Sequence, residues 1–409
     1  MRKTELLIPA GSLDVLKTAV VYGADAVYIG GEAFGLRAKA HNFSNEEMKQ
    51  GIAFAHARGV KVYVTANILA HNGDLPGVEA YFEEMRDVAP DALIISDPGV
   101  FAIARRVLPD MEIHISTQAN NTNYGTYQFW YGLGARRVVS ARELSLAEIR
   151  EIRDHIPQDM QIESFIHGAM CISYSGRCLL SNYFVGRDAN QGACTHPCRW
   201  KYSLVEETRP GEYMPVYENE RGTYIFNSKD LCMIEHIPEL VDAGIDSFKI
   251  EGRMKTALYV ATVARTYRKA IDDYKKDPAL YRKNMEWYKE EIGKCTYREF
   301  TTGFYFGKPT TDSQIYDSNT YVKNYTYLGT VEEVREDGCC RIEQKNKFSV
   351  GEQIEIMKPD GRNVLVAVTG ITDEDGNAME SAPHPKQVLW VDLGREVSPY
   401  DILRRSEIE

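Results

Sequence analysis

Short apolar runs alternate with amphipathic segments of helical length from the first residues to about position 275. This alternation predicts β-strands that are connected by helices. The expected strands are Leu6–Pro9, Ala26–Gly30, Lys61–Ala66, Ala92–Asp97, Glu112–Gln118, Arg137–Ala141, Gln161–His167 and Ser247–Glu251. Eight strands with helices between them predict a TIM-like (β/α)8 barrel of the α/β class. An open doubly wound sheet is the alternative, but no G-x-G-x-x-G sequence follows the first strand.

Helix boundaries agree with this pattern. Ser44 and Glu47 form a capping-box sequence at the start of the second expected helix. Gly23, Gly134 and Gly244 each follow a helical segment and lead into an expected strand. Glycine at such a position allows the left-handed turn that ends a helix. The recurrence of this feature supports repeated helix-to-strand units.

The sequence predicts two further parts of the chain, an insertion and a C-terminal domain. Residues 170–233 form a long insertion after the seventh expected strand. From about residue 321 the chain alternates apolar and polar positions, which predicts a small antiparallel β-barrel domain. The strands expected there are Tyr327–Val334, Cys340–Gln344, Gln353–Met357, Val364–Thr369 and Val388–Asp392. The predicted organisation is a barrel over 1–275, a helical and aromatic linker over 276–320, and the β-barrel domain over 321–409.

Half of the eight cysteines fall within one stretch of 28 residues in the insertion, with the spacing C-x6-C-x15-C-x3-C. They are Cys171, Cys178, Cys194 and Cys198. Clustered thiolates are typical of a soft-metal site, and both zinc and a 4Fe-4S cluster accept four of them. The spacing leaves both metals open. Disulfides are disfavoured, because the chain has no evident export signal or membrane-spanning run, and we expect it in the reducing cytoplasm.

A net charge of −11 argues against non-specific coating of nucleic acid. The insertion is locally basic, however, and its cations include Arg177 and Arg199. Aromatic residues such as Tyr183 and Trp200 are interleaved with these cations, a pattern that suits a stacked base and its phosphates. A solvated loop whose aromatic residues cover the metal site is the alternative interpretation.

Loops that follow the strands form the active face of such a barrel. Candidate residues therefore come from the carboxyl ends of the expected strands. Strand five offers His114, Gln118 and Asn120 for substrate binding, and strands seven and eight offer the catalytic candidates Glu163, His167, Lys249, Glu251 and Arg253. Arginine and lysine suit a dicarboxylate, and His167 suits acid–base chemistry near neutral pH. Glu163 and His167 also fit buried structural roles.

The run Glu163–Cys171, continuing through Gly176, Cys178 and Ser181, resembles the signature of the collagenase-like peptidase family. It matches E-x-F-x2-G-[SA]-[LIVM]-C-x4-G-x-C-x-[LIVM]-S at every fixed position. The downstream Cys194–Arg199 and Gly303–Tyr305 stretches are also similar to that family. The resemblance extends over essentially the whole chain.

The resemblance implies more than a fold. Family members of similar length and domain order are implied to be tRNA hydroxylation proteins that make 5-hydroxyuridine at the wobble position in the anticodon region, with prephenate as co-substrate. The four cysteines are implied to carry an iron–sulfur centre, which favours 4Fe-4S over zinc. Related members hydroxylate ribosomal RNA or act on a small molecule in ubiquinone synthesis.

Two other functions stay open. Proteolysis is the activity in the family name, but the chain contains neither H-E-x-x-H nor G-x-S-x-G. A peptidase would need an activated nucleophile or a metal-bound water. A non-enzymatic RNA-binding module, with the metal as a structural staple, is the other alternative.

Overall fold

The computed structural model describes residues 4–35, 42–171, 173–200, 203–204, 214–215, 227–309, 314–315 and 321–408. They fall into two compact units. The barrel unit lies within residues 1–16, 25–254 and 298–320, and the second unit lies within 17–24, 255–297 and 321–409. No helix in the described part of the chain is long and apolar enough to cross a bilayer.

Eight parallel strands form a closed barrel in the barrel unit. They are β1 (Glu5–Pro9), β2 (Ala26–Gly30), β3 (Lys61–Ala66), β4 (Ala92–Ile95), β5 (Ile113–Ile115), β6 (Arg137–Val139), β7 (Gln161–Gly168) and β12 (Ser247–Ile250). Neighbouring strands pair in chain order, and β12 pairs with both β7 and β1, which closes the barrel. The predicted TIM-like fold and all eight predicted strands are confirmed. Their apolar side chains are almost wholly buried, as expected for strands covered on both faces.

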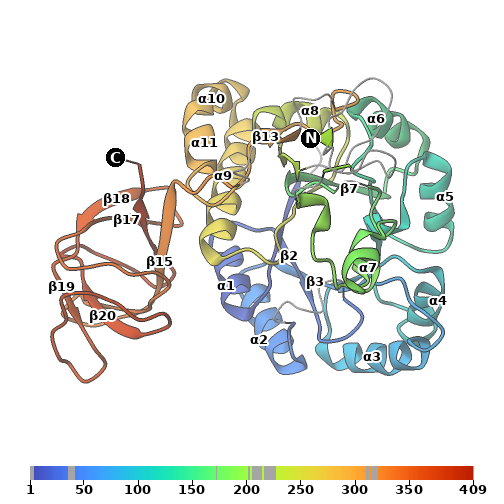
Figure 1. Cartoon of the computed structure of the whole chain (residues 1–409). Helices are drawn as coiled ribbons and strands as arrows, with labels where there is room; N and C mark the ends of the chain where they lie inside the picture. Colours follow the sequence, from blue (N-terminus) through green and yellow to red (C-terminus); the bar gives the residue numbers. More distant parts are fainter. Residues whose placement is uncertain are drawn as a thin grey trace. The chain divides into compact units, whose positions relative to one another are not determined.

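Helices alternate with these strands along the chain. They are α1 (Leu13–Val21), α2 (Asn45–His56), α3 (Leu75–Val88), α4 (Pro98–Val107), α5 (Tyr124–Gly132), α6 (Leu146–His155), α8 (Ile237–Asp242) and α9 (Ala257–Lys276). Figure 1 shows α2 to α6 around the outside of β2, β3 and β7. Ser44 and Glu47 form the predicted capping box of α2. Gly23, Gly134 and Gly244 have φ angles of 105°, 92° and 80°, so these turns require glycine.

The insertion follows β7, as predicted. It contains α7 (Leu180–Val185) and short 3-10 turns η2 (Ala189–Gln191) and η3 (Pro197–Arg199). Two more 3-10 turns, η1 (Thr117–Ala119) and η4 (Ile234–His236), precede α5 and α8. The other short strands of the barrel unit are β8 (Ser203–Leu204), β9 (Met214–Pro215), β10 (Asn227–Ser228), β11 (Asp230–Cys232), β13 (Phe300–Thr301) and β14 (Gln314–Ile315). β11 adds an antiparallel neighbour to β7 and pairs in parallel with β13.

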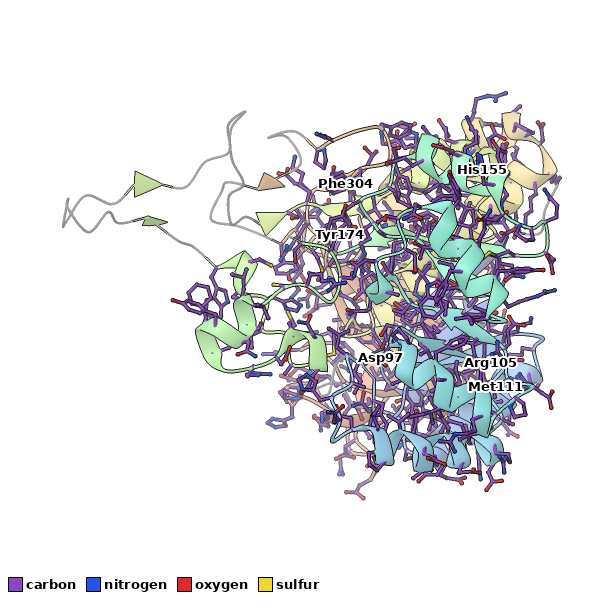
Figure 2. The ribbon with its side chains drawn as sticks, turned by 90° about the vertical axis from the view of Figure 1, so that its right-hand side faces the viewer. Asp97, Arg105, Met111, His155, Tyr174 and Phe304 are labelled. Atoms are coloured by element: carbon purple, nitrogen blue, oxygen red, sulfur yellow. The ribbon has the colours of Figure 1, made fainter. Side chains whose placement is uncertain are left out.

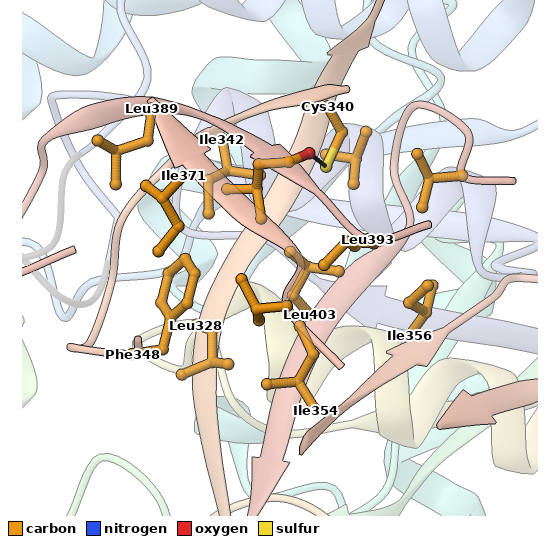
Figure 3. Packing of buried hydrophobic residues seen from close by; sticks show 14 of the residues in the cluster. Leu328, Cys340, Ile342, Phe348, Ile354, Ile356, Ile371, Leu389, Leu393 and Leu403 are labelled. Atoms are coloured by element: carbon orange, nitrogen blue, oxygen red, sulfur yellow. Dashed lines mark hydrogen bonds between the residues drawn. The ribbon is translucent and has the colours of Figure 1, made fainter. Parts of the chain in front are cut away.

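The second unit contains an antiparallel half-barrel. Its strands are β15 (Tyr325–Val334), β16 (Cys340–Glu343), β17 (Gln353–Met357), β18 (Asn363–Ala367), β19 (Gly370–Thr372), β20 (Val388–Asp392) and β21 (Ile402–Ser406). They form one sheet in the order β18-β17-β21-β15-β16-β20-β19. Leu328, Phe348, Ile354 and Leu403 are among the side chains that pack its core (Figure 3). The five predicted strands are present, and β19 and β21 are additional.

Helices of the second unit are tied to this sheet by a buried ion network. α10 (Pro278–Lys283) and α11 (Met285–Ile292) follow α9. Glu291 of α11 pairs with Arg265 of α9, and it accepts a hydrogen bond from Arg404 of β21 at 2.7 Å. These contacts group residues 255–297 with the sheet, whereas the sequence pattern placed 255–275 in the barrel and 276–297 in a linker.

Candidate functional site

A buried network of charged side chains occupies the amino-terminal half of the barrel. Glu163 of β7 lies level with Ser247, the first residue of β12. Its carboxylate accepts hydrogen bonds from Lys249 Nζ at 2.6 Å and Arg137 Nη1 at 2.9 Å, and Arg137 also donates to Glu5 Oε1 at 2.6 Å. Burial raises the pKa of Glu163, but Lys249 and Arg137 together hold it below its usual value. Two predicted catalytic residues, Glu163 and Lys249, are therefore ion-pair partners inside the barrel.

His114 of β5 lies at the same level, since it pairs in register with Arg137. Its ring is fully buried, with Nε2 2.8 Å from Glu112 Oε1. The ring makes an edge contact with Tyr63 at a centroid distance of 4.7 Å. Burial and the charge of Arg137 lower the pKa of His114, which favours the neutral imidazole. The structure thus places this predicted substrate-binding residue in the barrel interior and not at the carboxyl end of the strands.

At the carboxyl end of the strands, Arg142 connects two parts of the site. Its Nη1 donates to Cys171 Sγ at 3.4 Å, and its Nη2 lies 3.8 Å from Glu251 Oε2. The guanidinium also covers the ring of Phe165 at 4.1 Å. The Arg142 side chain is only 10% exposed, and its Nε has no hydrogen-bond partner among the described residues. Sequence reasoning missed Arg142, although it stands one position after the expected end of strand six.

Arg253 lies at the same end of the barrel. Its Nη1 donates to Thr65 Oγ1 at 3.0 Å, and the residue is 6% exposed. A Cβ atom on Gly30 would lie 2.5 Å from this Nη1, closer than real contacts allow. Glycine at the end of β2 therefore makes room for the guanidinium. The predicted role of Arg253 as a cation at the barrel mouth is consistent with this position.

The η1 turn after β5 supports the cysteine-containing segment. Gln118 and Asn120 lie on or beside η1, and the amide of Asn120 donates to the Gln118 carbonyl at 3.1 Å. A Cβ atom on Gly176 would lie 2.4 Å from Gln118 Oε1, so the segment between Cys171 and Cys178 packs closely on this turn. Gly176 also has a φ of 75°. Both requirements explain a glycine at this place in the motif. His167, near the end of β7, is buried, with its ring 5.6 Å from that of Phe300.

The four predicted metal ligands lie on one segment of the chain. Cys171 follows β7, Cys178 precedes α7, Cys194 lies between η2 and η3, and Cys198 belongs to η3. The His196 backbone amide donates to Cys194 Sγ at 3.4 Å. Such N–H donors suit sulfur atoms that carry negative charge.

This donor set fits a thiolate-bound metal centre in its chemistry. Over the described positions, however, no three or more His, Cys, Asp or Glu side chains are placed so that they could hold a metal ion. The metal assignment therefore stays a proposal. Of the two predicted RNA-binding arginines, Arg177 is exposed, and the side chain of Arg199 lies outside the described part of the structure.

A pocket of about 450 Å³ opens beside Cys171. It is lined by Glu143, Ser145, Glu148, Cys171, Ser173, Tyr174, Phe304, Gly307 and Lys308. Tyr174 and Phe304 lie close together at this end of the barrel (Figure 2). The volume of this pocket falls within the usual range for small-ligand sites. Sequence reasoning did not single out this pocket, because its walls come from three segments that are far apart in the chain.

Two anchors fix the walls of the pocket. Ser145 and Glu148 form a capping box at the start of α6. Tyr305 is buried, donates its hydroxyl to the Phe165 carbonyl at 2.5 Å, and accepts the Leu146 amide at its own carbonyl at 3.0 Å. These bonds hold the turn that carries Phe304 against β7 and α6. Burial also raises the pKa of the Glu143 carboxyl.

Comparison with known proteins agrees with this architecture. The model of "Peptidase family U32" matches residues 11–315, and that of its C-terminal domain matches residues 323–404. The chain is 43% identical to tRNA hydroxylation protein P1 of Bacillus subtilis over 99% of this chain and 96% of that one. It is 39% identical to tRNA hydroxylation protein P of Escherichia coli over 99% and 97%.

A third relative acts on a different RNA according to its name. The chain is 38% identical to the 23S rRNA 5-hydroxycytidine C2501 synthase of Escherichia coli, over 66% of this chain and 39% of that one. The two family models together cover most of the chain, and the first two relatives are matched almost from end to end. The chain therefore belongs to peptidase family U32.

Proposed function

We propose that this protein is an enzyme that hydroxylates tRNA, converting the wobble uridine to 5-hydroxyuridine. The observation that carries this proposal is the match along nearly the whole chain to two tRNA hydroxylation proteins, at 43% and 39% identity. Both matches extend over the residues of the barrel and of the C-terminal domain, so they do not rest on one domain alone. The specific base and the co-substrate are finer parts of the proposal.

The barrel mouth supports prephenate as co-substrate. Arg142 and Arg253 both lie at the carboxyl end of the strands, with their guanidinium groups largely buried. Prephenate carries two carboxylates, and arginine binds a carboxylate through paired N–H donors. The Nε of Arg142, which has no hydrogen-bond partner in the part of the chain that the structure describes, is one such donor. In this proposal Arg142 and Arg253 hold the co-substrate, and Glu251 orients Arg142.

Cys171, Cys178, Cys194 and Cys198 would hold a 4Fe-4S cluster, with zinc as the alternative metal. A bound cluster supplies one-electron transfer. With water as the oxygen source, replacing the uracil C5–H by C5–OH releases two electrons and two protons, and a bound cluster would pass these electrons one at a time to an external electron acceptor. The residues of this chain bind and orient the substrates: arginines hold carboxylates, and Arg142 donates to Cys171 Sγ.

Expression of the chain in a bacterium whose tRNA lacks 5-hydroxyuridine tests the activity. Mass spectrometry of tRNA nucleosides should detect 5-hydroxyuridine with the wild-type chain and not with Cys194→Ala. Cys339→Ala, which changes a cysteine of the second unit, is the matched control and should retain activity. A folded wild-type chain that leaves tRNA unmodified would refute the proposal. New 5-hydroxycytidine in ribosomal RNA would favour the rRNA alternative instead.

Metal analysis tests the cofactor separately. Protein purified without oxygen should contain about four iron and four sulfide per chain, and Cys194→Ala should lose both. Stoichiometric zinc without iron would replace the cluster by a zinc site. Peptide hydrolysis by the zinc form, with no modified tRNA, would support the peptidase alternative.

A further inference from the structure

We propose that the pocket beside Cys171 receives the target uracil, flipped out of the anticodon loop and stacked between Tyr174 and Phe304. This inference rests on the proposed tRNA function and specifies where the base binds. It assigns the pocket to the RNA substrate and the arginines of the barrel mouth to the dicarboxylate.

The aromatic walls favour a flat ligand. Tyr174 comes from the cysteine-containing segment, and Phe304 comes from the turn that Tyr305 anchors to β7. Tyr174 is 45% exposed, so its ring is accessible to a ligand. Single-stranded loops present unstacked bases to aromatic side chains of this kind. The pocket thus takes one aromatic ring from the turn beside the anchored Tyr305 and another from the cysteine-containing segment.

The charged side chains that line the pocket disfavour prephenate as its ligand. Glu143 and Glu148 line it together with Lys308. The Glu148 carboxylate accepts from Ser145 N at 2.8 Å and is committed to the α6 cap, whereas Glu143 is not part of that cap. The two carboxylates of the lining disfavour a dicarboxylate such as prephenate inside the pocket, whereas Arg142, which interacts with Glu143 and Cys171, lies behind this wall. Uracil is neutral, and it offers an N3–H donor to a carboxylate and carbonyl acceptors to an ammonium.

The position of Cys171 links the pocket to the proposed chemistry. This cysteine lines the pocket and also accepts the Arg142 hydrogen bond. A base held here would lie beside the same segment that carries the four thiols. A volume of about 450 Å³ is ample for one pyrimidine. Enzymes that act on a base commonly bind it in such a recess outside the helix stack.

Photo-crosslinking tests the location directly. An anticodon stem–loop RNA with 4-thiouridine at the target position would be irradiated with the full-length protein, and the crosslinked peptide would be identified by mass spectrometry. We expect crosslinks to the peptides that contain Tyr174 or Phe304. Crosslinks confined to other exposed aromatic residues, such as Tyr183 or Trp200, would overturn the proposal.

Variants test the binding energy. Tyr174→Ala and Phe304→Ala should each weaken binding of the stem–loop by about ten-fold, because each loses one stacking face. Both should leave the KM for prephenate unchanged, and Tyr174→Phe should behave like wild type. Phe129→Ala, which removes an exposed aromatic ring from α5, is the control and should bind RNA normally.

The outcomes separate this inference from the proposed function. If Tyr174→Ala and Phe304→Ala raise the KM for prephenate and leave RNA binding intact, the pocket belongs to the co-substrate and the inference is wrong. If the wild-type chain modifies no tRNA, the proposed function fails, and the crosslinking result still decides whether the pocket binds a pyrimidine. Circular dichroism of each variant verifies that the fold is retained.

Discussion

Arg142 Nη1 donates a hydrogen bond to the sulfur of Cys171 at 3.4 Å. The same guanidinium lies 3.8 Å from Glu251 and over the ring of Phe165. One side chain therefore connects the cysteine-containing segment, the loop after β12 and β7 itself. This arrangement gives the barrel mouth a cation whose position is set from three sides.

Replacing Arg142 by Gln should raise the KM for prephenate by about 10- to 100-fold, because a charge-assisted hydrogen bond to a carboxylate is lost. The KM for tRNA should change little. Arg142→Lys should recover part of the affinity, since it keeps the charge but not the planar fork. Steady-state kinetics with each substrate varied in turn makes the measurement. An equal loss for both substrates would remove Arg142 from the carboxylate site.

The Glu163–Lys249 pair should be important for stability whether or not it takes part in catalysis. Lys249→Met leaves the Glu163 carboxylate buried with one cation fewer and should cost about 3–5 kcal/mol of unfolding free energy. Glu163→Gln combined with Lys249→Met should recover part of this loss. Urea unfolding followed by circular dichroism measures both.

The exposed pair Arg106–Glu79 provides the control for that experiment. Its side chains are 61% and 46% exposed, so Arg106→Ala should change the stability by less than about 1 kcal/mol. A Lys249→Met protein that unfolds like wild type but is inactive would instead identify Lys249 as a catalytic residue.

Acid should destabilise the second unit through Glu291. Burial raises the pKa of Glu291, but Arg404 and Arg265 outweigh it and lower the pKa to about 2. A carboxyl with a depressed pKa stabilises the fold above its usual pKa of 4.5, and this stabilisation is lost as the pH falls from about 4.5 toward about 2. The shift corresponds to about 3 kcal/mol.

Thermal unfolding between pH 6 and pH 2 measures this effect. Glu291→Gln should be less stable than wild type at pH 6, and the difference should shrink toward pH 2. Glu380→Gln changes an exposed acid of the same unit and should leave the curve unchanged. A constant difference between Glu291→Gln and wild type across this range would contradict the assigned role.

Gly30→Ala should displace Arg253, because the new Cβ would lie 2.5 Å from its Nη1. We expect a loss of about 1–3 kcal/mol of stability, typical of overpacking, together with reduced activity. Gly73→Ala is the control, since among the described residues no atom beyond its chain neighbours lies within 4 Å of the added Cβ. Melting curves and nucleoside analysis of both variants test the prediction. Normal activity of Gly30→Ala would show that the position of Arg253 is not critical.

Local signals in the sequence were sufficient to predict the barrel. Each strand is a short apolar run, and residues such as Gly134 and Gly244 mark the turns before strands through their left-handed conformation. β21 escaped prediction because three of its five residues are polar. Its Arg404 is buried only because Glu291 and Glu355 neutralise it, and those partners lie far away in the chain.

The candidate site also contains residues that the sequence singles out and contacts that only the tertiary fold creates. Spacing and residue type alone single out the four cysteines as candidate metal ligands, and this assignment stays a prediction. The partners of Glu163 were not recognisable, because Lys249 lies 86 positions away and the contact depends on closure of the barrel. Glu251, in the loop after β12, lies next to Arg142, a residue that sequence reasoning did not single out. Periodicity gives the direction of a side chain, but the tertiary fold decides which group it meets.

The anchoring of Tyr305 limits how far this protein can be shortened. Its hydroxyl bonds to a strand that lies 140 positions earlier in the sequence, and β13 just before it joins the same sheet. A fragment that stops after β12 would keep all eight strands of the barrel. It would lose the pocket wall that Phe304, Gly307 and Lys308 form. Engineers who seek a minimal catalyst from this scaffold therefore have to carry the chain at least through Lys308.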